Sequence, residues 1–205
     1  MKKLLFLFLL IAGLNDLAAQ SEKDYIIEID GDSVFASLGE PAKFMLKDGK
    51  SIVIKIRKKE FLSFQKGPVS FSYPSKYSVT SKAIDEDAEQ ILLMSAGGAG
   101  IMIQVYSSLS PTGIVDFMLA QIAEDDIKAG YKESKTDIEK QTNNGILLKG
   151  KRAVLKMDDD IKVYSVLSYG KGKKGIMIIE INSEDLEKDE QQLFDVFWSS
   201  LTVKY

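Results

Sequence analysis

Apolar and polar residues alternate along the first part of the chain, so residues 22–66 are expected to form short strands. One alternating stretch covers residues 25–30 and a second covers residues 52–57. Just before the second stretch, Asp48-Gly49 predicts a β-hairpin with a tight type I′ turn, in which both central residues take positive φ.

Six cationic residues surround this predicted hairpin. We expect them to lie on its solvated face or to protect a strand edge from pairing. A basic patch that binds a ligand is the sharper alternative. The residues are Lys47, Lys50, Lys55, Arg57, Lys58 and Lys59.

The next region predicts more regular strands. Residues 69–73 alternate hydrophobic side chains with serine, and Pro74 is expected to stop this strand because it cannot donate to a ladder. Two more apolar stretches, residues 91–94 and 101–106, flank a glycine-rich segment at residues 97–100 and predict a pair of strands joined by a turn.

Three further strands are predicted, at residues 146–157, 161–169 and 176–181. In the first of them the alternation slips near Gly150, which indicates a β-bulge. The acidic residues 158–160 and the glycine-rich residues 170–175 are expected to form the intervening turns. The last strand is apolar at nearly every position, as expected of a central strand covered on both faces.

Two helices are predicted from apolar residues at helical spacing. The first begins at Pro111, with Ser110 as its N-cap, and stops at Gly130. The second is capped by Asn182 or Ser183, and its apolar stripe contains Leu186, Leu193, Phe197 and Leu201. The chain then closes on a short extended segment.

The N-terminus has the layout of a secretory signal peptide. Lys2 and Lys3 precede a short run of apolar residues, and small residues follow at Ala18-Ala19. Because a membrane-spanning helix needs about 20 apolar residues, this run is better explained as a signal peptide cleaved after Ala19. We therefore expect a periplasmic or secreted protein.

The composition of the remaining chain suits a globular domain that does not bind polyanions. Removing residues 1–19 takes Lys2, Lys3 and Asp16 from 27 basic and 30 acidic residues, which leaves a net charge of −4. With 45% hydrophobic residues the chain can bury a core. Its mild negative charge argues against binding to nucleic acid or to anionic membrane surfaces.

The chain contains neither cysteine nor histidine. An exported protein without cysteine folds without disulfides and has no thiol nucleophile or thiolate metal ligand. Without histidine it also lacks the commonest general base and the most frequent transition-metal ligand in proteins. We accordingly expect no catalytic residues, no metal-binding or cofactor-binding residues, and no cofactor.

Residues 69–204 resemble the PsbP-like fold, which includes the DcrB-like envelope proteins of bacteria. The likeness lies in the opening strand with proline and tyrosine at residues 69–79, in the helix that begins at Pro111, and in the closing helix and strand with Trp198. The resemblance implies an antiparallel sheet sandwiched by helices, used mostly for binding and assembly. It implies no catalytic residues.

Two glycine-rich segments could suggest phosphate-binding loops. Such loops join a strand to a helix N-terminus, whereas residues 97–100 and 170–175 both precede predicted strands, so turns are favoured. Ser63-Phe64-Gln65-Lys66 fits the Ser-x-x-Lys pattern of penicillin-recognising enzymes, but both companion motifs are missing and a chance match is favoured.

Three acidic clusters could hold calcium. None has the spacing of a calcium-binding loop, so solvated turns and helix surface are favoured over metal sites. The clusters lie at residues 85–87, 124–126 and 158–160.

The sequence therefore predicts an α+β fold in which an antiparallel β-sheet is sandwiched by helices, with a small N-terminal β-hairpin region. Its expected parts are a signal peptide at 1–19, β-strands at 20–66 and a PsbP-like domain at 67–205. We expect a non-enzymatic binding or assembly module of the cell envelope, with a protein or small-molecule partner. The alternatives are a carboxylate-dependent hydrolase of glycan-type substrates and a structural component that pairs by strand addition.

Overall fold

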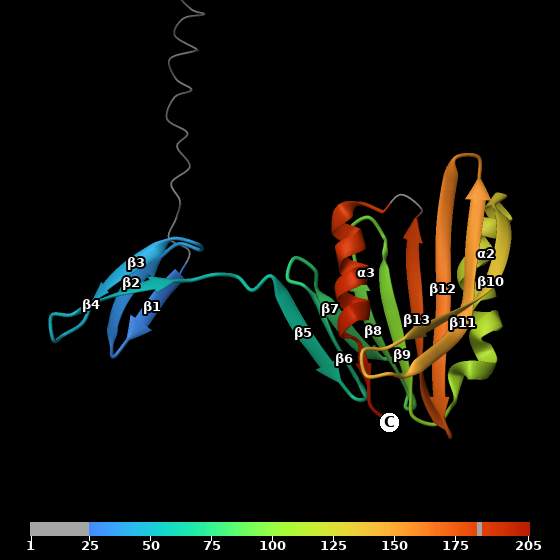
Figure 1. Ribbon diagram of the computed structural model, residues 1–205, viewed down its shortest axis with the longest axis horizontal. Coiled ribbons are helices and arrows are strands. Elements are labelled where there is room, and N and C mark those ends of the chain that lie inside the picture. The colour runs from blue at the N-terminus through green and yellow to red at the C-terminus, as the bar shows by residue number, and fades with distance from the viewer. Residues whose placement is uncertain (1–24, 184–185) are drawn as a thin grey trace, which may run out of the picture. The chain divides into compact units, whose positions relative to one another are not determined.

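The computed structural model describes residues 25–183 and 186–205 and divides the chain into two compact units (Figure 1). The division falls between Lys58 and Lys59, whereas the sequence suggested a boundary after residue 66. Strand β5 (Phe61–Lys66) pairs along its whole length with β6 (Val69–Pro74), which is why it belongs to the C-terminal unit. The signal peptide expected over residues 1–19 lies outside the described residues.

The N-terminal unit consists of two antiparallel hairpins. Their strands are β1 (Tyr25–Ile29), β2 (Asp32–Ala36), β3 (Pro41–Met45) and β4 (Ser51–Lys55). The first hairpin has a two-residue turn in which Asp30 and Gly31 take φ of 50° and 84°, as a type I′ turn requires. The expected type I′ turn at Asp48-Gly49 is wrong, because only Gly49 has positive φ and the loop there is longer.

A seven-stranded antiparallel sheet dominates the C-terminal unit. Its strand order is β10-β11-β12-β13-β9-β8-β7. The bounds are β7 Val79–Ala83, β8 Ala88–Met94, β9 Gly100–Tyr106, β10 Lys132–Gln141, β11 Leu147–Met157, β12 Asp160–Lys171 and β13 Lys174–Ser183. A second, three-stranded sheet has the order β14-β6-β5, in which β14 (Thr202–Val203) is the short closing segment predicted from the sequence.

Helices cover both faces of the large sheet. The 3-10 helix η1 (Pro111–Ile114) and α2 (Val115–Ala129) pack on one face, and α3 (Lys188–Ser200) lies on the other with the small sheet. Strand β13 lies at the centre, and its side chains enter the two cores alternately: Ile176 and Ile178 pack under α3, while Met177 and Ile179 pack under α2.

The expected fold class, α+β, is wrong. Strands contain 54% of the described residues and helices only 18%, so the fold is mainly antiparallel β. Two strands that the sequence did not predict add to the sheet: β7 and β10 carry few apolar residues, because they are its edges and each faces solvent.

Several local predictions also need correction. The β-bulge expected at Gly150 is wrong, since β11 pairs without interruption to both neighbours. Gly150 instead allows the backbones of β11 and β12 to approach closely, because a Cβ at this position would lie 1.8 Å from the carbonyl oxygen of Val166. The second helix is capped by neither Asn182 nor Ser183, which end β13; its N-cap position is Glu187.

The glycine-rich segment at residues 170–175 has a structural role. Gly172 takes φ of 63° at the tight turn between β12 and β13. Gly170 and Gly175 are cross-strand partners, and a Cβ on either would collide with Ser110 or Pro111. The missing side chains therefore make room for η1 on the sheet. Ser110 occupies the N-cap position before Pro111, as predicted, but its hydroxyl makes no capping hydrogen bond.

Candidate functional site

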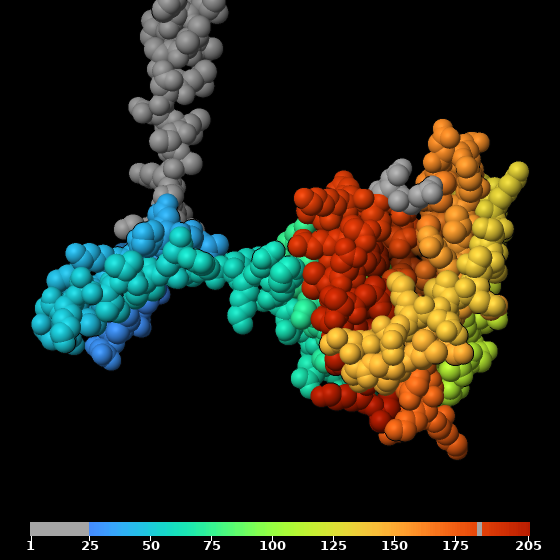
Figure 2. Space-filling model, viewed as in Figure 1, coloured from blue at the N-terminus to red at the C-terminus, as the bar shows by residue number. Residues whose placement is uncertain are grey.

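A cleft of about 290 Å³ opens between α3 and strands β10 to β13 on the face of the sheet that α3 covers. In Figure 2 the red atoms of α3 lie beside the golden atoms of the β10–β11 hairpin. We call this cavity the Glu180 cleft. It is lined by Ile138, Glu139, Lys140, Arg152, Val163, Ser165, Glu180, Asn182, Leu186, Gln191, Phe194, Asp195 and Trp198.

The central polar residue of the cleft is a buried carboxylate. Glu180 follows Ile176 and Ile178 on the α3-facing side of β13 and is only 4% exposed. Its Oε1 atom accepts hydrogen bonds from Lys140 Nζ at 2.8 Å and from Trp198 Nε1 at 2.5 Å. The Lys140 ammonium also lies 4.2 Å from the centre of the indole ring. These contacts join β13, β10 and α3, and they compensate a charge that would be costly to bury alone.

Other polar groups face the same cavity. Ser165 on β12 is 4% exposed, and its hydroxyl makes no hydrogen bond with a described residue. Arg152 on β11 is exposed at the cleft and forms no ion pair within the part of the chain that the structure describes. Asp195 on α3 accepts a hydrogen bond from Gln191 Nε2 at 2.8 Å. A cation, an anion and a hydroxyl are thus available to a bound molecule.

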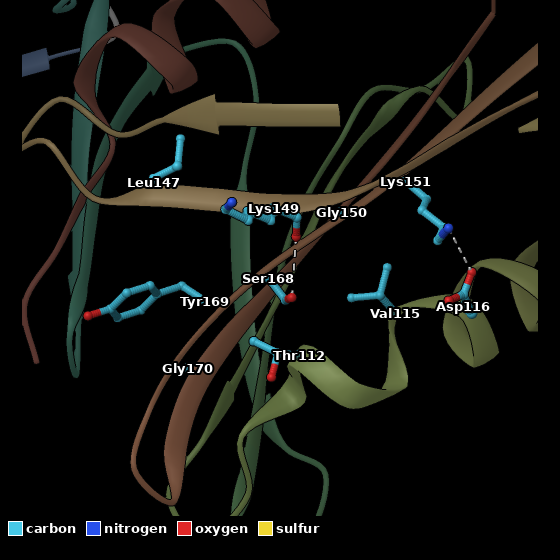
Figure 3. A pocket seen from close by; sticks show the side chains of 10 residues that line it. All are labelled: Thr112, Val115, Asp116, Leu147, Lys149, Gly150, Lys151, Ser168, Tyr169 and Gly170. Carbon is cyan, nitrogen blue, oxygen red and sulfur yellow. Dashed lines mark hydrogen bonds and ion pairs between the residues drawn. The ribbon is translucent and has the colours of Figure 1, made fainter. Parts of the chain in front are cut away.

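A second pocket, of about 390 Å³, lies on the opposite face of the sheet beside η1 and the start of α2 (Figure 3). Its lysines are already paired: Lys151 contacts Asp137 at 3.0 Å and Asp116 at 3.5 Å, and Lys149 contacts Glu139 at 3.0 Å. Ser168 donates to the carbonyl oxygen of Lys149 at 3.4 Å. Because these polar groups satisfy one another, this pocket is the weaker candidate.

A network of hydrogen bonds and ion pairs connects the C-terminal end of α2 to strand β12. Asp126 accepts hydrogen bonds from Lys162 Nζ at 2.6 Å and from the Tyr164 hydroxyl at 2.5 Å. Tyr131 donates its hydroxyl proton to Asp160, and Lys162 lies over the ring of Tyr131. These contacts hold the C-terminal end of α2 to β12.

The network shifts the pKa values of its members. Burial by itself raises the pKa of the Asp126 carboxyl, but the hydrogen bonds from Lys162 and Tyr164 outweigh it, and the pKa is lowered. The hydrogen bond to Asp126 raises the pKa of Lys162. Burial of the phenol, followed by its hydrogen bond to Asp126, raises the pKa of Tyr164 to about 12.

The segments weighed as sites from the sequence lie elsewhere. The glycines at residues 97–100 form the turn between β8 and β9, and Ser63 to Lys66 belong to strand β5. Residues 85–87 lie between β7 and β8, 124–126 in α2 and 158–160 at the β11–β12 turn. Among the described residues, no group of three or more acidic side chains is placed to hold a metal ion.

One structural feature favours each of the two alternative functions, the carboxylate-dependent hydrolase and the component that pairs by strand addition. Glu180 and Asp195 line one cleft, as a carboxylate-dependent hydrolase requires, although Glu180 is ion-paired to Lys140. Among the strands that the structure describes, β4 pairs with β3 alone, and it exposes Val53, as strand addition requires. Both functions stay predictions.

Sequence reasoning did not identify the cleft residues. Glu180 interrupts an otherwise apolar central strand, which was the one available signal of a buried charge. The other members come from four strands, from α3 and from the segment before it, and they meet through the strand order and the packing of α3 on the sheet.

Across the described ranges, no helix combines the length and the apolar character needed to cross a membrane. The chain matches no protein-family model, and no curated protein is significantly similar to it, so the likeness to the PsbP-like fold stays a prediction.

Proposed function

We propose that the protein is an exported binding module of the bacterial cell envelope and that its ligand occupies the Glu180 cleft. The observation that carries the proposal is the buried Glu180 carboxylate at a cavity with a buried serine hydroxyl and an exposed arginine. Ligand sites combine apolar walls with polar groups that fix the orientation of the ligand, and here Phe194 and Trp198 supply an apolar wall beside mostly polar lining residues. The volume of about 290 Å³ lies at the small end of such sites and favours a small ligand.

The charges of the cleft favour a zwitterionic ligand. Lys140 neutralises Glu180, and Lys149 neutralises Glu139, which leaves Arg152 and Asp195 as the charged groups open to a ligand. A guanidinium binds a carboxylate well, and an aspartate binds an ammonium group. We therefore propose an amino acid or a short peptide, with its apolar part against Phe194 and Trp198.

Trp198 provides a direct test, because it is the only tryptophan in the chain and its indole lines the cleft. We would titrate the purified protein with free L-amino acids and dipeptides and follow tryptophan fluorescence. We expect a saturable change for at least one compound. Arg152→Ala should weaken that binding about tenfold or more, since a charge-assisted hydrogen bond contributes roughly 1.5–3 kcal/mol.

Lys151→Ala is the matched control. Lys151 precedes Arg152 on the same strand, but its side chain lies on the opposite face, where it pairs with Asp116 and Asp137. Like Arg152→Ala, the Lys151→Ala change removes one positive charge from β11, but it leaves the Glu180 cleft intact, so ligand binding should not change. Equal losses in both variants, or no saturable change with any compound, would contradict the proposal.

A further inference from the structure

The two hairpins of the N-terminal unit carry opposite charges. The acidic hairpin, residues 25–36 (β1–β2), contains Glu28, Asp30 and Asp32 and no basic residue. The basic hairpin, residues 41–55 (β3–β4), contains four lysines and one aspartate. Their formal charges are −3 and +3. The N-terminal unit is therefore nearly neutral as a whole, but its negative and positive charges are separated between the two hairpins.

Each hairpin also exposes large apolar side chains on its outer face. In the acidic hairpin, Ile26 and Phe35 are cross-strand partners with 61% and 57% exposure. In the basic hairpin, Met45 and Val53 are 58% and 69% exposed. On the opposite faces Ala36 and Phe44 are buried, and most of the residues beside them are half-buried. Exposed apolar pairs of this kind mark interaction surfaces.

The charges on these outer faces flank the apolar residues. Glu28 follows Ile26 on the same face of β1 by strand alternation. Lys43 is the cross-strand partner of Val53, and Lys55 follows Val53 on the same face of β4. None of these three charged residues forms an ion pair with a described residue, whereas Lys47 pairs with Asp32 within the unit at 3.7 Å.

We propose that a second copy of this chain covers these faces, with the acidic hairpin of one copy against the basic hairpin of the other. Both halves of the interface are then present on every chain: the apolar pair beside Glu28 on one copy meets the apolar pair beside Lys43 and Lys55 on the other. Opposite charges fix the partner and its register. The faces are small, so the association is weak and salt-sensitive.

Charge reversal in matched pairs tests this directly. Sedimentation velocity of the wild-type protein should show concentration-dependent association from about 10 μM to about 1 mM at low salt. Glu28→Lys gives the outer face of the acidic hairpin a positive charge, so the outer faces of both hairpins are then positive. The double change Lys43→Glu with Lys55→Glu gives the outer face of the basic hairpin two negative charges, so both outer faces are then negative. Each variant alone should associate at least about tenfold more weakly than wild type. An equimolar mixture of the two should regain association, since each then offers the charge that the other lacks.

A separate variant and its control test how much the exposed apolar side chains contribute to association. Phe35→Ser should weaken association, while Leu109→Ser, at a side chain that is 45% exposed in the C-terminal unit, should leave it unchanged. Circular dichroism of each variant confirms that it is folded. A wild-type protein that stays monomeric throughout, or reversed variants whose mixture associates no better than either alone, overturns the proposal.

Discussion

Trp198 on α3 donates its indole proton to the buried carboxylate of Glu180 on β13, with 2.5 Å between nitrogen and oxygen. The same oxygen accepts from Lys140 on β10. One carboxylate therefore fixes the positions of a helix and an edge strand on either side of the cleft. The arrangement makes Glu180 a residue on which both the stability and the binding geometry depend.

Glu180→Gln should lower the free energy of unfolding by about 1–2 kcal/mol, because the amide cannot pair with the Lys140 ammonium in a largely buried setting. Urea unfolding followed by circular dichroism measures this difference. Glu139→Gln is the control, since Glu139 and Lys149 are 55% and 70% exposed and should matter by less than about 0.5 kcal/mol. Equal costs at the two positions would contradict a structural role for Glu180.

Much of the fold follows from short patterns in the sequence. The alternation in residues 69–73 and the apolar run at 176–181 correctly located β6 and the central β13. Turn chemistry was less decisive: Asp30-Gly31 and Asp48-Gly49 are the same dipeptide, but only the first forms a two-residue turn with two positive φ angles. The difference lies in the register of the flanking strands, which a dipeptide does not specify.

The cleft could not be predicted, because its residues are distant in the sequence. Arg152, Glu180 and Trp198 belong to β11, β13 and α3, which meet through the strand order of the large sheet and the packing of α3 on it. The edge strand β10 was also missed, because its ten residues contain a single isoleucine and otherwise polar side chains. A strand that is exposed at most of its positions leaves almost no periodic signal.

Gly150→Ala should be among the most destabilising single changes, because the new Cβ would lie 1.8 Å from the Val166 carbonyl oxygen. Two backbones would have to separate, so we expect a loss of about 3 kcal/mol or more in urea unfolding. Gly113→Ala is the control: its Cβ meets no atom within 4 Å. If both changes are tolerated equally, β11 and β12 do not approach as described.

Alkaline pH should destabilise the protein through Tyr164. Its pKa is raised from 10.0 in the unfolded chain to about 12 in the fold, so the folded state favours the protonated phenol. This stabilisation is complete below pH 10.0 and is lost as the pH rises toward about 12. Urea unfolding across this range should show a smaller pH dependence for Tyr164→Phe than for wild type. Tyr25→Phe, at an exposed side chain, should keep the full dependence.

Brief trypsin treatment should separate the two units. Arg57, Lys58 and Lys59 are exposed and lie at the division between them, outside any strand. We expect a C-terminal fragment beginning at Lys58, Lys59 or Glu60 that keeps its circular dichroism spectrum and its cooperative thermal unfolding. A fragment that unfolds on release would show that the C-terminal unit depends on the hairpins.

The most direct test of the proposed function is a nuclear magnetic resonance titration with the amino acids and dipeptides of the fluorescence panel. The single tryptophan gives one indole N–H signal, from Trp198, which donates to Glu180 inside the cleft. We predict that a ligand moves this signal saturably, together with the amide signals of Ser165 and Asn182. A ligand that leaves the indole signal unchanged and moves the signals of Thr112 and Lys149 instead would place binding in the pocket of Figure 3 and contradict the account.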